Sequence, residues 1–341
     1  MKNALIIGAN GMDGSHLIEF LLEKKYNIYG IIRRSSLFNT SRIEHILKDI
    51  HLLYGDVTDV INITNILKTI KEKIGNERLE IYNLAAQSHV AVSFELPQYT
   101  ANVDATGVLN ILEAVRLNSM EEQVRFYQAS TSEMFGMVQE IPQTENTPFY
   151  PRSPYAVAKL YGHWITKNYR ESYNMHTSSG ILFNHSGPRR GENFILRKIS
   201  LGIKKILNGD EEFLYLGNLD SKRDIGHSKD YCRGMWLMLQ QDIPDDYVLA
   251  TGKQYSIREF VEKSFKVINI PIDWRGSGLN EEGFDPNTGR VYIKISEKYF
   301  RPAEVDTLLG DASKAKSILN WEPEISIDEL IHEIVNNDLN K

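Results

Sequence analysis

Tyr155 and Lys159 are the two residues in this chain whose types and spacing most directly suggest chemistry. Side chains four residues apart on a helix share one face, so an ammonium group can lie beneath a phenol and favour the phenolate. Such a phenolate is a base for the proton of an alcohol. Ser153 and Pro154 are typical of a helix start. The simpler alternative is a core tyrosine beside a surface lysine.

Glu133 offers a second base, directly after Ser130, Thr131 and Ser132. A glutamate that follows a strand is often only solvated. Simple alcohol oxidation needs no carboxylate, however, so two bases in one site suggest chemistry at two carbons. The sequence therefore predicts a site that works on neighbouring positions of its substrate.

The elements that must position these residues follow a regular alternation. Short apolar runs alternate with helical stretches as far as about residue 183, which is typical of βα units and a parallel sheet. The apolar runs cover residues 4–7, 28–32, 50–54, 81–85, 125–129 and 177–183. Later, Ser256 and Ser326 each begin a capping box before an apolar-striped helix, and residues 276–290 indicate a loop or turn-rich insert. We predict an α/β fold, with a Rossmann-like doubly wound parallel sheet and a smaller C-terminal α/β substrate-binding lobe.

A glycine-rich turn links the first apolar run to a helix. Gly8, Gly11 and Gly14 lie in the segment Gly8-Ala9-Asn10-Gly11-Met12-Asp13-Gly14. Glycines there allow a tight turn and a close approach to a pyrophosphate, whose charge the helix N-terminus favours. A plain strand-to-helix turn would also explain the triplet. Its position after the first strand favours a dinucleotide site.

The position that usually carries an acid for the ribose is occupied by Arg33, followed by Arg34, Ser35 and Ser36. An acid there favours NAD, whereas arginines can pair with a 2′-phosphate, so the sequence favours NADP. A solvated basic turn is the alternative. The segment Gly55-Asp56-Val57 follows a predicted strand and is placed to contact the adenine. Residues 84–88 are placed to line the pyrophosphate and nicotinamide side of the site. Ordinary turns at the ends of strands would explain both segments equally well.

Composition and charge narrow the function classes. The net charge of −6 offers no basic field for nucleic acid or an anionic membrane. The only cysteine, Cys232, excludes an internal disulfide and fits a reducing compartment. Nine histidines without close His-x-x-x-His spacing give no metal site. The first apolar run is too short for a membrane span, so we expect a cytoplasmic protein.

These motifs together resemble a known family. Gly-x-x-Gly-x-x-Gly with Tyr-x-x-x-Lys is similar to the extended short-chain dehydrogenases/reductases. More narrowly, essentially the whole chain resembles the GDP-mannose 4,6-dehydratase family. The segments that carry this resemblance are residues 33–36, 39–40, 83–90, 130–136, 188–194, 216–220, 276–290 and 299–306.

The resemblance implies a role for each matching residue. Tyr155, assisted by Lys159, would take the proton of the sugar C4 hydroxyl while its hydride passes to NADP+. Glu133 would remove the C5 hydrogen, and Glu133 or Ser132 would protonate the hydroxyl that leaves C6 as water. Hydride return to C6 then makes the cycle redox-neutral. Thr131 would hydrogen-bond the sugar oxygen at C4. The product would be GDP-4-keto-6-deoxymannose, a precursor for deoxyhexoses such as fucose or rhamnose.

The resemblance also extends the two binding sites. Together with the motif residues above, the predicted cofactor site comprises Gly8, Asn10, Gly11, Met12, Asp13, Gly14, Arg33, Arg34, Ser35, Ser36, Asp56, Val57, Leu84, Ala85, Ala86, Gln87, Ser88, Tyr99, Lys159, His185 and Arg190. The predicted substrate site comprises Ser88, Asn184, Lys198, Arg223, Arg301 and Glu304. Cations suit a diphosphate and a carboxylate suits ribose hydroxyls. Without the resemblance, each basic residue is more simply a surface charge.

The same resemblance implies a division of the chain and an assembly. Residues 1–183 would form the NADP-binding domain, with returns from about 225–255, and residues 184–341 mainly the nucleotide-sugar lobe. The loop from Arg33 to His45 would reach a neighbouring subunit near the cofactor, which predicts a homo-oligomer, specifically a tetramer. The chain departs from the family at Ser186-Gly187, where Glu-Ser is usual, and at Ile225, where an aromatic is common.

Other functions share part of this pattern. A nucleotide-sugar 4-epimerase would have the same fold and Tyr–Lys pair but does not need Glu133. A dTDP-glucose 4,6-dehydratase typically has Asp-Glu where this chain has Ser132-Glu133, and lacks the insert at 276–290. A silent dinucleotide-sensing protein would be expected to lose Tyr155, Lys159 or Glu133, and all three are present.

Overall fold

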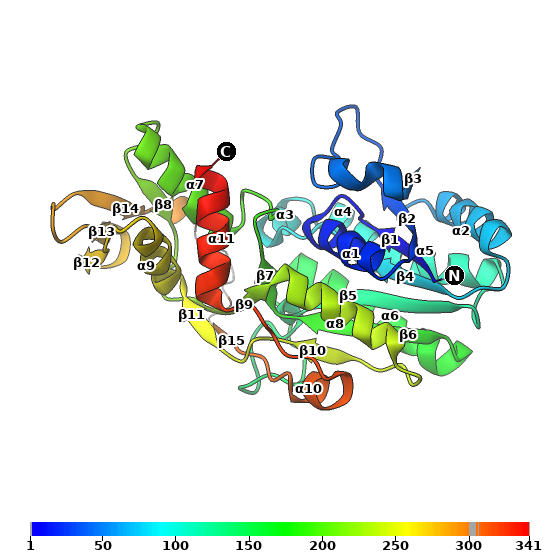
Figure 1. The fold of residues 1–341 in the computed structure, drawn as a ribbon. Helices are drawn as coiled ribbons and strands as arrows, with labels where there is room; N and C mark the ends of the chain where they lie inside the picture. Colours follow the sequence, from blue (N-terminus) through cyan, green and yellow to red (C-terminus); the bar gives the residue numbers. More distant parts are fainter. Residues whose placement is uncertain (1, 300–304, 306, 341) are drawn as a thin grey trace.

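A seven-stranded parallel sheet forms the larger body of the molecule in the computed structural model, which describes residues 2–299, 305 and 307–340 (Figure 1). Every adjacent pair of its strands is parallel. In order across the sheet, the strands are β10 (Tyr247–Leu249), β6 (His176–Leu182), β5 (Val124–Thr131), β4 (Leu79–Asn83), β1 (Asn3–Ile7), β2 (Asn27–Ile32) and β3 (His51–Tyr54). The central strands β1, β4 and β5 are buried along nearly their whole length because helices cover both faces of the sheet.

Two layers of helices bury the sheet. Leu17, Met235 and Trp321 belong to the core on one face, and Ile63, Ile111 and Phe126 to the core on the other. The first layer, which faces the viewer in Figure 1, contains α1 (Met12–Glu23), α8 (Ser228–Gln240) and α10 (Ser313–Leu319). The second layer contains α2 (Val60–Ile74), α5 (Gly107–Leu117) and α6 (Pro154–Tyr173).

The strand order reverses between β1 and β4. The chain winds from β1 through β2 to β3 on one side and from β4 through β5 to β6 on the other. In such sheets the ligand crevice lies outside the carboxyl ends of the strands at this reversal. The topology confirms the predicted Rossmann-like α/β fold, and it brings the glycine turn after β1 close to the segment after β4.

A smaller α/β lobe lies beside the carboxyl edge of the large sheet (Figure 1). Its core joins the apolar faces of three helices and one sheet, with Ile199, Phe260, Ile293 and Ile331 among the buried residues. The helices are α7 (Ile195–Asn208), α9 (Ile257–Val267) and α11 (Ile327–Leu339). The sheet contains β12 (Asp273–Arg275), β13 (Glu282–Phe284), β14 (Val291–Ile295) and β8 (Leu214–Leu216).

A third, four-stranded sheet connects the two bodies. Here β9 (Lys222–His227) pairs with β7 (Asn184–Ser186), β11 (Gln254–Ser256) and β15 (Thr307–Leu308). Shorter elements complete the described chain: α3 (Val90–Glu95), α4 (Pro97–Ala101), the π-helical segment η2 (Asn102–Thr106), and the 3-10 turns η1 (Glu44–Asp49), η3 (Ser132–Met134), η4 (Gly278–Asn280) and η5 (Glu297–Tyr299). None of the helices in the described ranges has the length and apolar character needed to cross a membrane.

The structure confirms the predicted capping boxes but corrects the prediction for residues 276–290. Both predicted capping boxes form, with Ser256 paired to Glu259 and Ser326 paired to Glu329. Residues 276–290, predicted as a loop or turn-rich insert, are only partly so. They contain η4 and the strand β13, which pairs with β12 on one side and β14 on the other. This strand has only three residues, one of them Gly283, so its pairing with the neighbouring strands rather than its local composition decides its structure.

A buried ion pair fastens the smaller lobe to the segment that follows β7. Arg197 on α7 contacts Asp338 on α11, with 2.8 Å between Nε and Oδ2, and Ser200 donates to the same carboxylate. Arg197 also donates to the carbonyl of Arg190 at 2.9 Å. The pair therefore sets the position of the chain that carries Arg190.

We predict that Arg197→Met lowers the free energy of unfolding by about 3–5 kcal/mol, because it leaves the Asp338 carboxylate buried without its cation. Urea unfolding would measure this. The double variant Arg197→Met/Asp338→Leu is expected to lose clearly less. Lys205→Met, which breaks the exposed pair with Glu211, should cost at most about 1 kcal/mol. Equal small losses in Arg197→Met and Lys205→Met would contradict the prediction.

Candidate active site

A large cavity opens between the carboxyl edge of the parallel sheet and the smaller lobe. Its volume is about 1790 Å³. Pockets for one small ligand typically measure about 300–1,000 Å³, so this cavity has room for two. Both bodies contribute to its lining, from the glycine turn after β1 to Lys198 on α7 and Tyr299 in η5.

The glycine turn has the geometry that a dinucleotide needs. Gly8 has φ of +91°, and a Cβ there would lie 3.1 Å from the backbone of Leu84. A Cβ on Gly14 would lie 2.3 Å from the Gly8 carbonyl oxygen, so only glycine allows α1 to start this close to β1. The amide groups at the start of α1 are then available to an anion in the cavity. A pyrophosphate fits this cradle.

Asp13 connects the start of α1 to the segment after β6. Its Oδ2 lies 2.9 Å from Nε2 of His185, whose Nδ1 contacts the Phe183 carbonyl oxygen at 2.9 Å. The His185 ring stacks on Tyr231 at 4.5 Å between centroids. Burial acts to raise the pKa of Asp13, but His185 and the nearby Arg190 outweigh it and the pKa is lowered. Asp13 is therefore held as a carboxylate.

The loop after β2 lies at the mouth of the cavity. Arg33 donates to the Tyr99 hydroxyl, and both residues line the cavity. Asn10 donates to the Asn39 carbonyl oxygen at 2.8 Å, which joins this loop to the glycine turn. The Arg33 side chain is exposed to solvent.

The proposed proton-transfer residues converge at the carboxyl end of β5. Tyr155 and Lys159 come from the first two turns of α6, and Thr131 and Glu133 come from the end of β5 and from η3. All four line the cavity and are at most 9% exposed. Thr131 hydrogen-bonds the Tyr155 phenol and also accepts from the Glu133 amide at 3.2 Å. Two bases thus meet in one buried place.

Burial dominates the protonation of this group. It raises the pKa of Tyr155 well above its ordinary value, and the negative charges of Asp104 and Glu133 act in the same direction. The Thr131 hydrogen bond and the positive charge of Arg190 oppose them. The Lys159 ammonium lies 6.0 Å from the centroid of the phenol ring. Tyr155 is therefore a neutral phenol in the unliganded protein.

Several cations line the lobe side of the cavity, next to the carboxylates of Glu211 and Glu212. Lys198 lies 3.1 Å from the ring centroid of Tyr299, and burial, with a smaller contribution from Lys298, lowers the pKa of Lys198 to about 8. Arg223 on β9 and Asn184 on β7 line the same region. These groups suit a diphosphate and its attached sugar.

The structure brings together most of the predicted site and leaves a few residues aside. Arg34 lies over the Tyr54 ring at 5.2 Å, and the Ser35 hydroxyl accepts from the Leu37 amide at 3.3 Å. These two residues, with Ser36 and Ser132, are not among those lining the cavity. Arg301 and Glu304 lie outside the described residues. The predicted site residues that line the cavity are Gly8, Asn10, Gly11, Met12, Asp13, Gly14, Arg33, Asp56, Val57, Leu84, Ala85, Ala86, Gln87, Ser88, Tyr99, Thr131, Glu133, Tyr155, Lys159, Asn184, His185, Arg190, Lys198 and Arg223.

Sequence reasoning missed several groups. Asn193, in the loop after β7, and Lys298 and Tyr299, in η5, line the cavity although none of them was predicted as a site residue. Asp104 is buried behind it, at 1% exposure. Asp104 did leave a signal, because it falls on the apolar face that includes Val108 at i+4.

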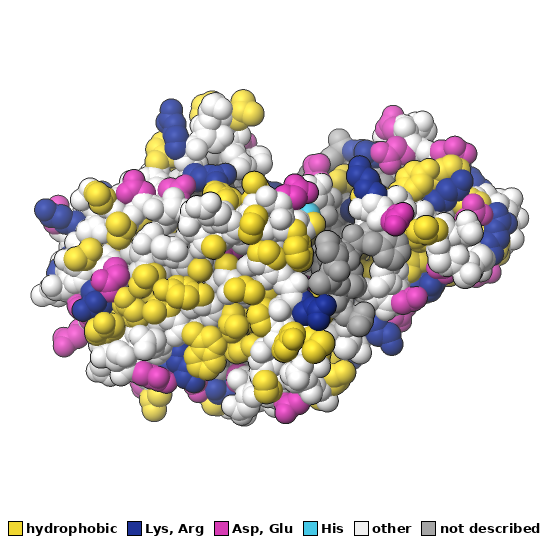
Figure 2. Space-filling view, turned by 180° about the vertical axis from the view of Figure 1, so that it is seen from behind, with side chains coloured by type: hydrophobic (Ala, Val, Ile, Leu, Met, Phe, Trp, Pro, Cys, Tyr) yellow, Lys and Arg dark blue, Asp and Glu magenta, His cyan; other side chains and the backbone are white. Residues whose placement is uncertain are grey.

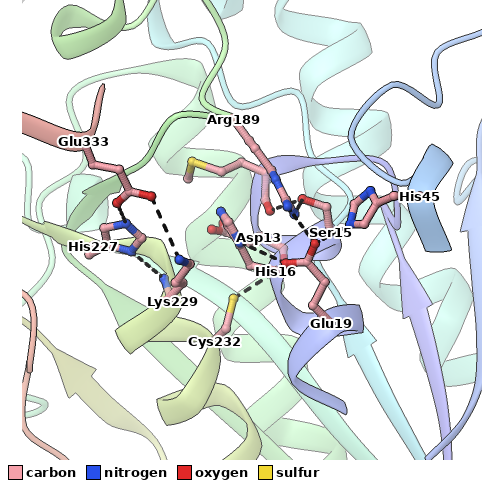
Figure 3. Close-up of polar contacts among 11 residues, drawn as sticks. Asp13, Ser15, His16, Glu19, His45, Arg189, His227, Lys229, Cys232 and Glu333 are labelled. Atoms are coloured by element: carbon pink, nitrogen blue, oxygen red, sulfur yellow. Dashed lines mark hydrogen bonds and ion pairs between the residues drawn. The ribbon is translucent and has the colours of Figure 1, made fainter. Parts of the chain in front are cut away.

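A polar network outside the cavity secures the glycine turn (Figure 3). Arg189 donates to Ser15 at 3.1 Å and pairs with Glu19 at 2.6 Å, so the segment before Arg190 is tied to α1. His45, in η1, contacts the same Glu19 at 2.5 Å. Figure 3 shows Glu19 on α1 between Arg189 and His45, so α1 is bonded to both segments.

Comparisons with known proteins agree with this geometry. Residues 5–334 match the family model described as GDP-mannose 4,6 dehydratase. The chain is 56% identical to the GDP-mannose 4,6-dehydratase of Yersinia enterocolitica, over 99% of this chain and 94% of that protein. It is 54% identical to the human GDP-mannose 4,6 dehydratase, over 98% of this chain and 91% of the human protein. A dTDP-glucose 4,6-dehydratase from Streptomyces venezuelae, solved with NAD bound, has the same fold, with a TM-score of 0.81. It is 20% identical to this chain, and the match covers 98% of this chain and 96% of that one. The family model and the sequence identities over nearly the whole length together establish that the chain belongs to the GDP-mannose 4,6-dehydratase family.

Proposed function

We propose that this protein is a hydro-lyase that converts GDP-mannose to GDP-4-keto-6-deoxymannose with NADP as its bound cofactor. The observation that carries the proposal is the burial of Tyr155, Lys159 and Glu133 together in one cavity beside the glycine turn. A 4-epimerase would need only the first two. The product would supply the synthesis of a deoxyhexose such as fucose or rhamnose.

The side chains divide the proton transfers between them. Tyr155 takes the proton of the C4 hydroxyl, and Thr131, already bonded to the phenol, holds the oxygen at C4. The C4 hydride would pass to the bound nicotinamide, and the resulting 4-ketone acidifies the hydrogen at C5, which Glu133 removes. Glu133 then protonates the C6 hydroxyl as it leaves as water. The stored hydride would return to C6 while a proton returns to C5. General acid–base help of this kind contributes roughly 10²–10⁴-fold per group.

The cofactor site is formed by the larger body. The chemistry that a nicotinamide supplies when bound is a reversible store for one hydride. The glycine turn would hold the pyrophosphate, and Arg33, which donates to the Tyr99 hydroxyl, would pair with a 2′-phosphate. Asp56, whose Oδ1 accepts from the Thr58 amide at 2.9 Å, would contact the adenosine end. The division of labour follows, with residues 1–183 mainly for the cofactor and residues 184–341 mainly for the nucleotide-sugar.

A homo-oligomer, specifically a tetramer, is part of this proposal. Leu37 and Phe38 are 79% and 97% exposed at the tip of the loop after β2, which projects from the body (Figure 1). Apolar side chains also gather on the face covered by α2, α5 and α6 (Figure 2), and Val157, Tyr161 and Trp164 form an exposed stripe along α6. Surfaces of this kind favour contact with another copy. One cysteine and a net charge of −6 support a cytoplasmic location.

Incubation of the purified protein with GDP-mannose and catalytic NADP+ should give a product lighter by one water, without net NADPH. Mass spectrometry and cofactor absorbance would measure both. Glu133→Gln is expected to oxidise C4 once, which accumulates NADPH, and to release no water. Glu171→Gln, on the exposed end of α6, is the matched control and should behave as the wild type. Normal dehydration by Glu133→Gln would remove Glu133 from its role, and an unchanged substrate mass in the wild type would point to epimerisation or to another sugar.

Arg33→Ala should weaken NADP+ binding at least tenfold and NAD+ binding much less, because only NADP carries the 2′-phosphate. Calorimetry with both cofactors measures the two affinities. Arg78→Ala, an exposed arginine in the turn before β4, is the control. Unchanged NADP+ affinity in Arg33→Ala would overturn the cofactor assignment.

Light scattering should give the mass of a tetramer for the wild type. Trp164→Glu places a charge in the apolar stripe of α6, so it should lower the mass to that of a dimer or monomer. Ile243→Glu, exposed in a loop after α8, should leave the mass unchanged. A monomeric wild type at micromolar concentration would rule out the assembly.

A further inference from the structure

Asp104 is a buried carboxylate that the mechanism above does not use. It lies in η2, the π-helical segment between α4 and α5, and is 1% exposed. Its Oδ1 accepts from the backbone amide of Gln87 at 2.7 Å. Its Oδ2 is buried without a hydrogen-bond partner among the described residues. A fully buried carboxylate is costly unless a cation acts on it, so a nearby positive group is expected.

Helix α6 brings that positive group to Asp104. A Cβ on Gly162 would lie 3.0 Å from the Asp104 carbonyl oxygen, so the helix approaches the backbone of η2 closely at this point. Lys159 lies three residues earlier and therefore on the same face of α6. Lys159 is the only cation whose charge acts on Asp104, and Asp104 is the only carboxylate acting on Lys159, within the described ranges. Gly162 thus lets the backbone at Asp104 lie close to the face of α6 that carries Lys159.

We propose that Asp104 is a positioning residue of the dehydratase reaction, which keeps Lys159 charged on the face of α6 that also carries Tyr155 and holds the Gln87 backbone on the cofactor side of the cavity. The inference rests on the proposed roles of Tyr155 and Lys159. Asp104 touches neither substrate nor cofactor. It acts through Lys159 on one side and through the Gln87 amide on the other.

The electrostatics of the pair agree with this arrangement. Burial lowers the pKa of Lys159, and the Asp104 charge opposes that effect. Burial raises the pKa of Asp104 to about 6, although Lys159 and the Gln87 hydrogen bond act to lower it. Tyr155 also faces Glu133 from η3 and Arg190 from the segment after β7. Since both of these remain in an Asp104 variant, a change of that residue alone isolates its own charge.

The test is the pH dependence of kcat in Asp104→Asn. The asparagine oxygen can still accept from the Gln87 amide, but the negative charge is gone. Without it Lys159 loses its proton at lower pH, and Tyr155 loses a charge that raised its own pKa. The plot of kcat against pH is expected to rise on its acidic limb and fall on its basic limb. Both limbs should therefore move to lower pH, by about one unit. A purely structural role would lower the rate without moving the limbs.

Asp230→Asn is the matched control. Asp230 is also buried and accepts from the amides of Glu324 and Ile325 at 3.0 Å, but it does not line the cavity. Asp230→Asn should lower the stability of the protein but leave both limbs of the pH profile of kcat at their wild-type positions. Unmoved limbs in an active Asp104→Asn enzyme would overturn the proposal for Asp104 alone, whereas a wild type without dehydratase activity would overturn the proposed function instead.

A second measurement does not depend on the folding of Asp104→Asn. In Lys159→Met, Asp104 loses its cation and should be protonated at pH 7, so infrared spectroscopy should show the carbonyl stretch of a buried carboxylic acid that the wild type lacks. Absence of that band in a folded Lys159→Met protein would contradict the pairing. A Lys159→Met enzyme with full turnover would instead contradict the role of Lys159 in the proposed function.

Discussion

The removal of proton-transfer groups from water is the constraint on which this structure depends. Tyr155, Lys159 and Glu133 carry or develop charge, yet each is buried at the end of β5. Charged forms are costly in such a place unless opposite charges and hydrogen bonds are already arranged around them. Polar groups around the cavity therefore satisfy one another, as Thr131 does for the phenol and the Gln87 amide does for Asp104.

The same constraint explains how the smaller lobe is joined to the sheet. Asp224 on β9 is fully buried and accepts from the amides of Thr251 and Gly252 at 2.8 and 2.9 Å. Burial raises its pKa to about 6, with the hydrogen bonds from Thr251, Gly252 and Gly310 acting against that rise. Backbone amides replace water around this carboxylate, so the junction next to Arg223 is fixed by directional bonds rather than by apolar packing alone. Arg223 thereby has a defined position on the cavity wall.

The sequence predicted the fold because apolar periodicity is a local property. The runs at 4–7, 28–32 and 125–129 became β1, β2 and β5, and parallel strands must then expose their carboxyl ends on one edge. The residues that follow those strands could be placed for the same reason. The glycine turn and the Tyr155–Lys159 pair belong to this predictable class, since their spacing encodes their geometry.

The structural features that the sequence did not predict depend on contacts between segments that are far apart in the chain. The partner of Lys159 is Asp104, 55 positions away, and the pairing depends on a close approach at Gly162 that no local pattern reveals. The tie of Arg189 to Glu19 joins segments 170 positions apart. The strand β13 within 276–290 exists because β12 and β14 flank it. In each case tertiary packing supplied the information.

Helix α6 is used on both of its sides. One face carries Tyr155, Lys159 and the close approach at Gly162, and the opposite face presents the exposed stripe that includes Trp164. A neighbouring copy seated on that stripe would restrict the motion of the helix before any sugar arrives, so part of the entropy of ordering the two catalytic side chains would already be lost. Turnover would then depend on protein concentration, and dilution below the dissociation constant of the assembly would lower the activity of every subunit together.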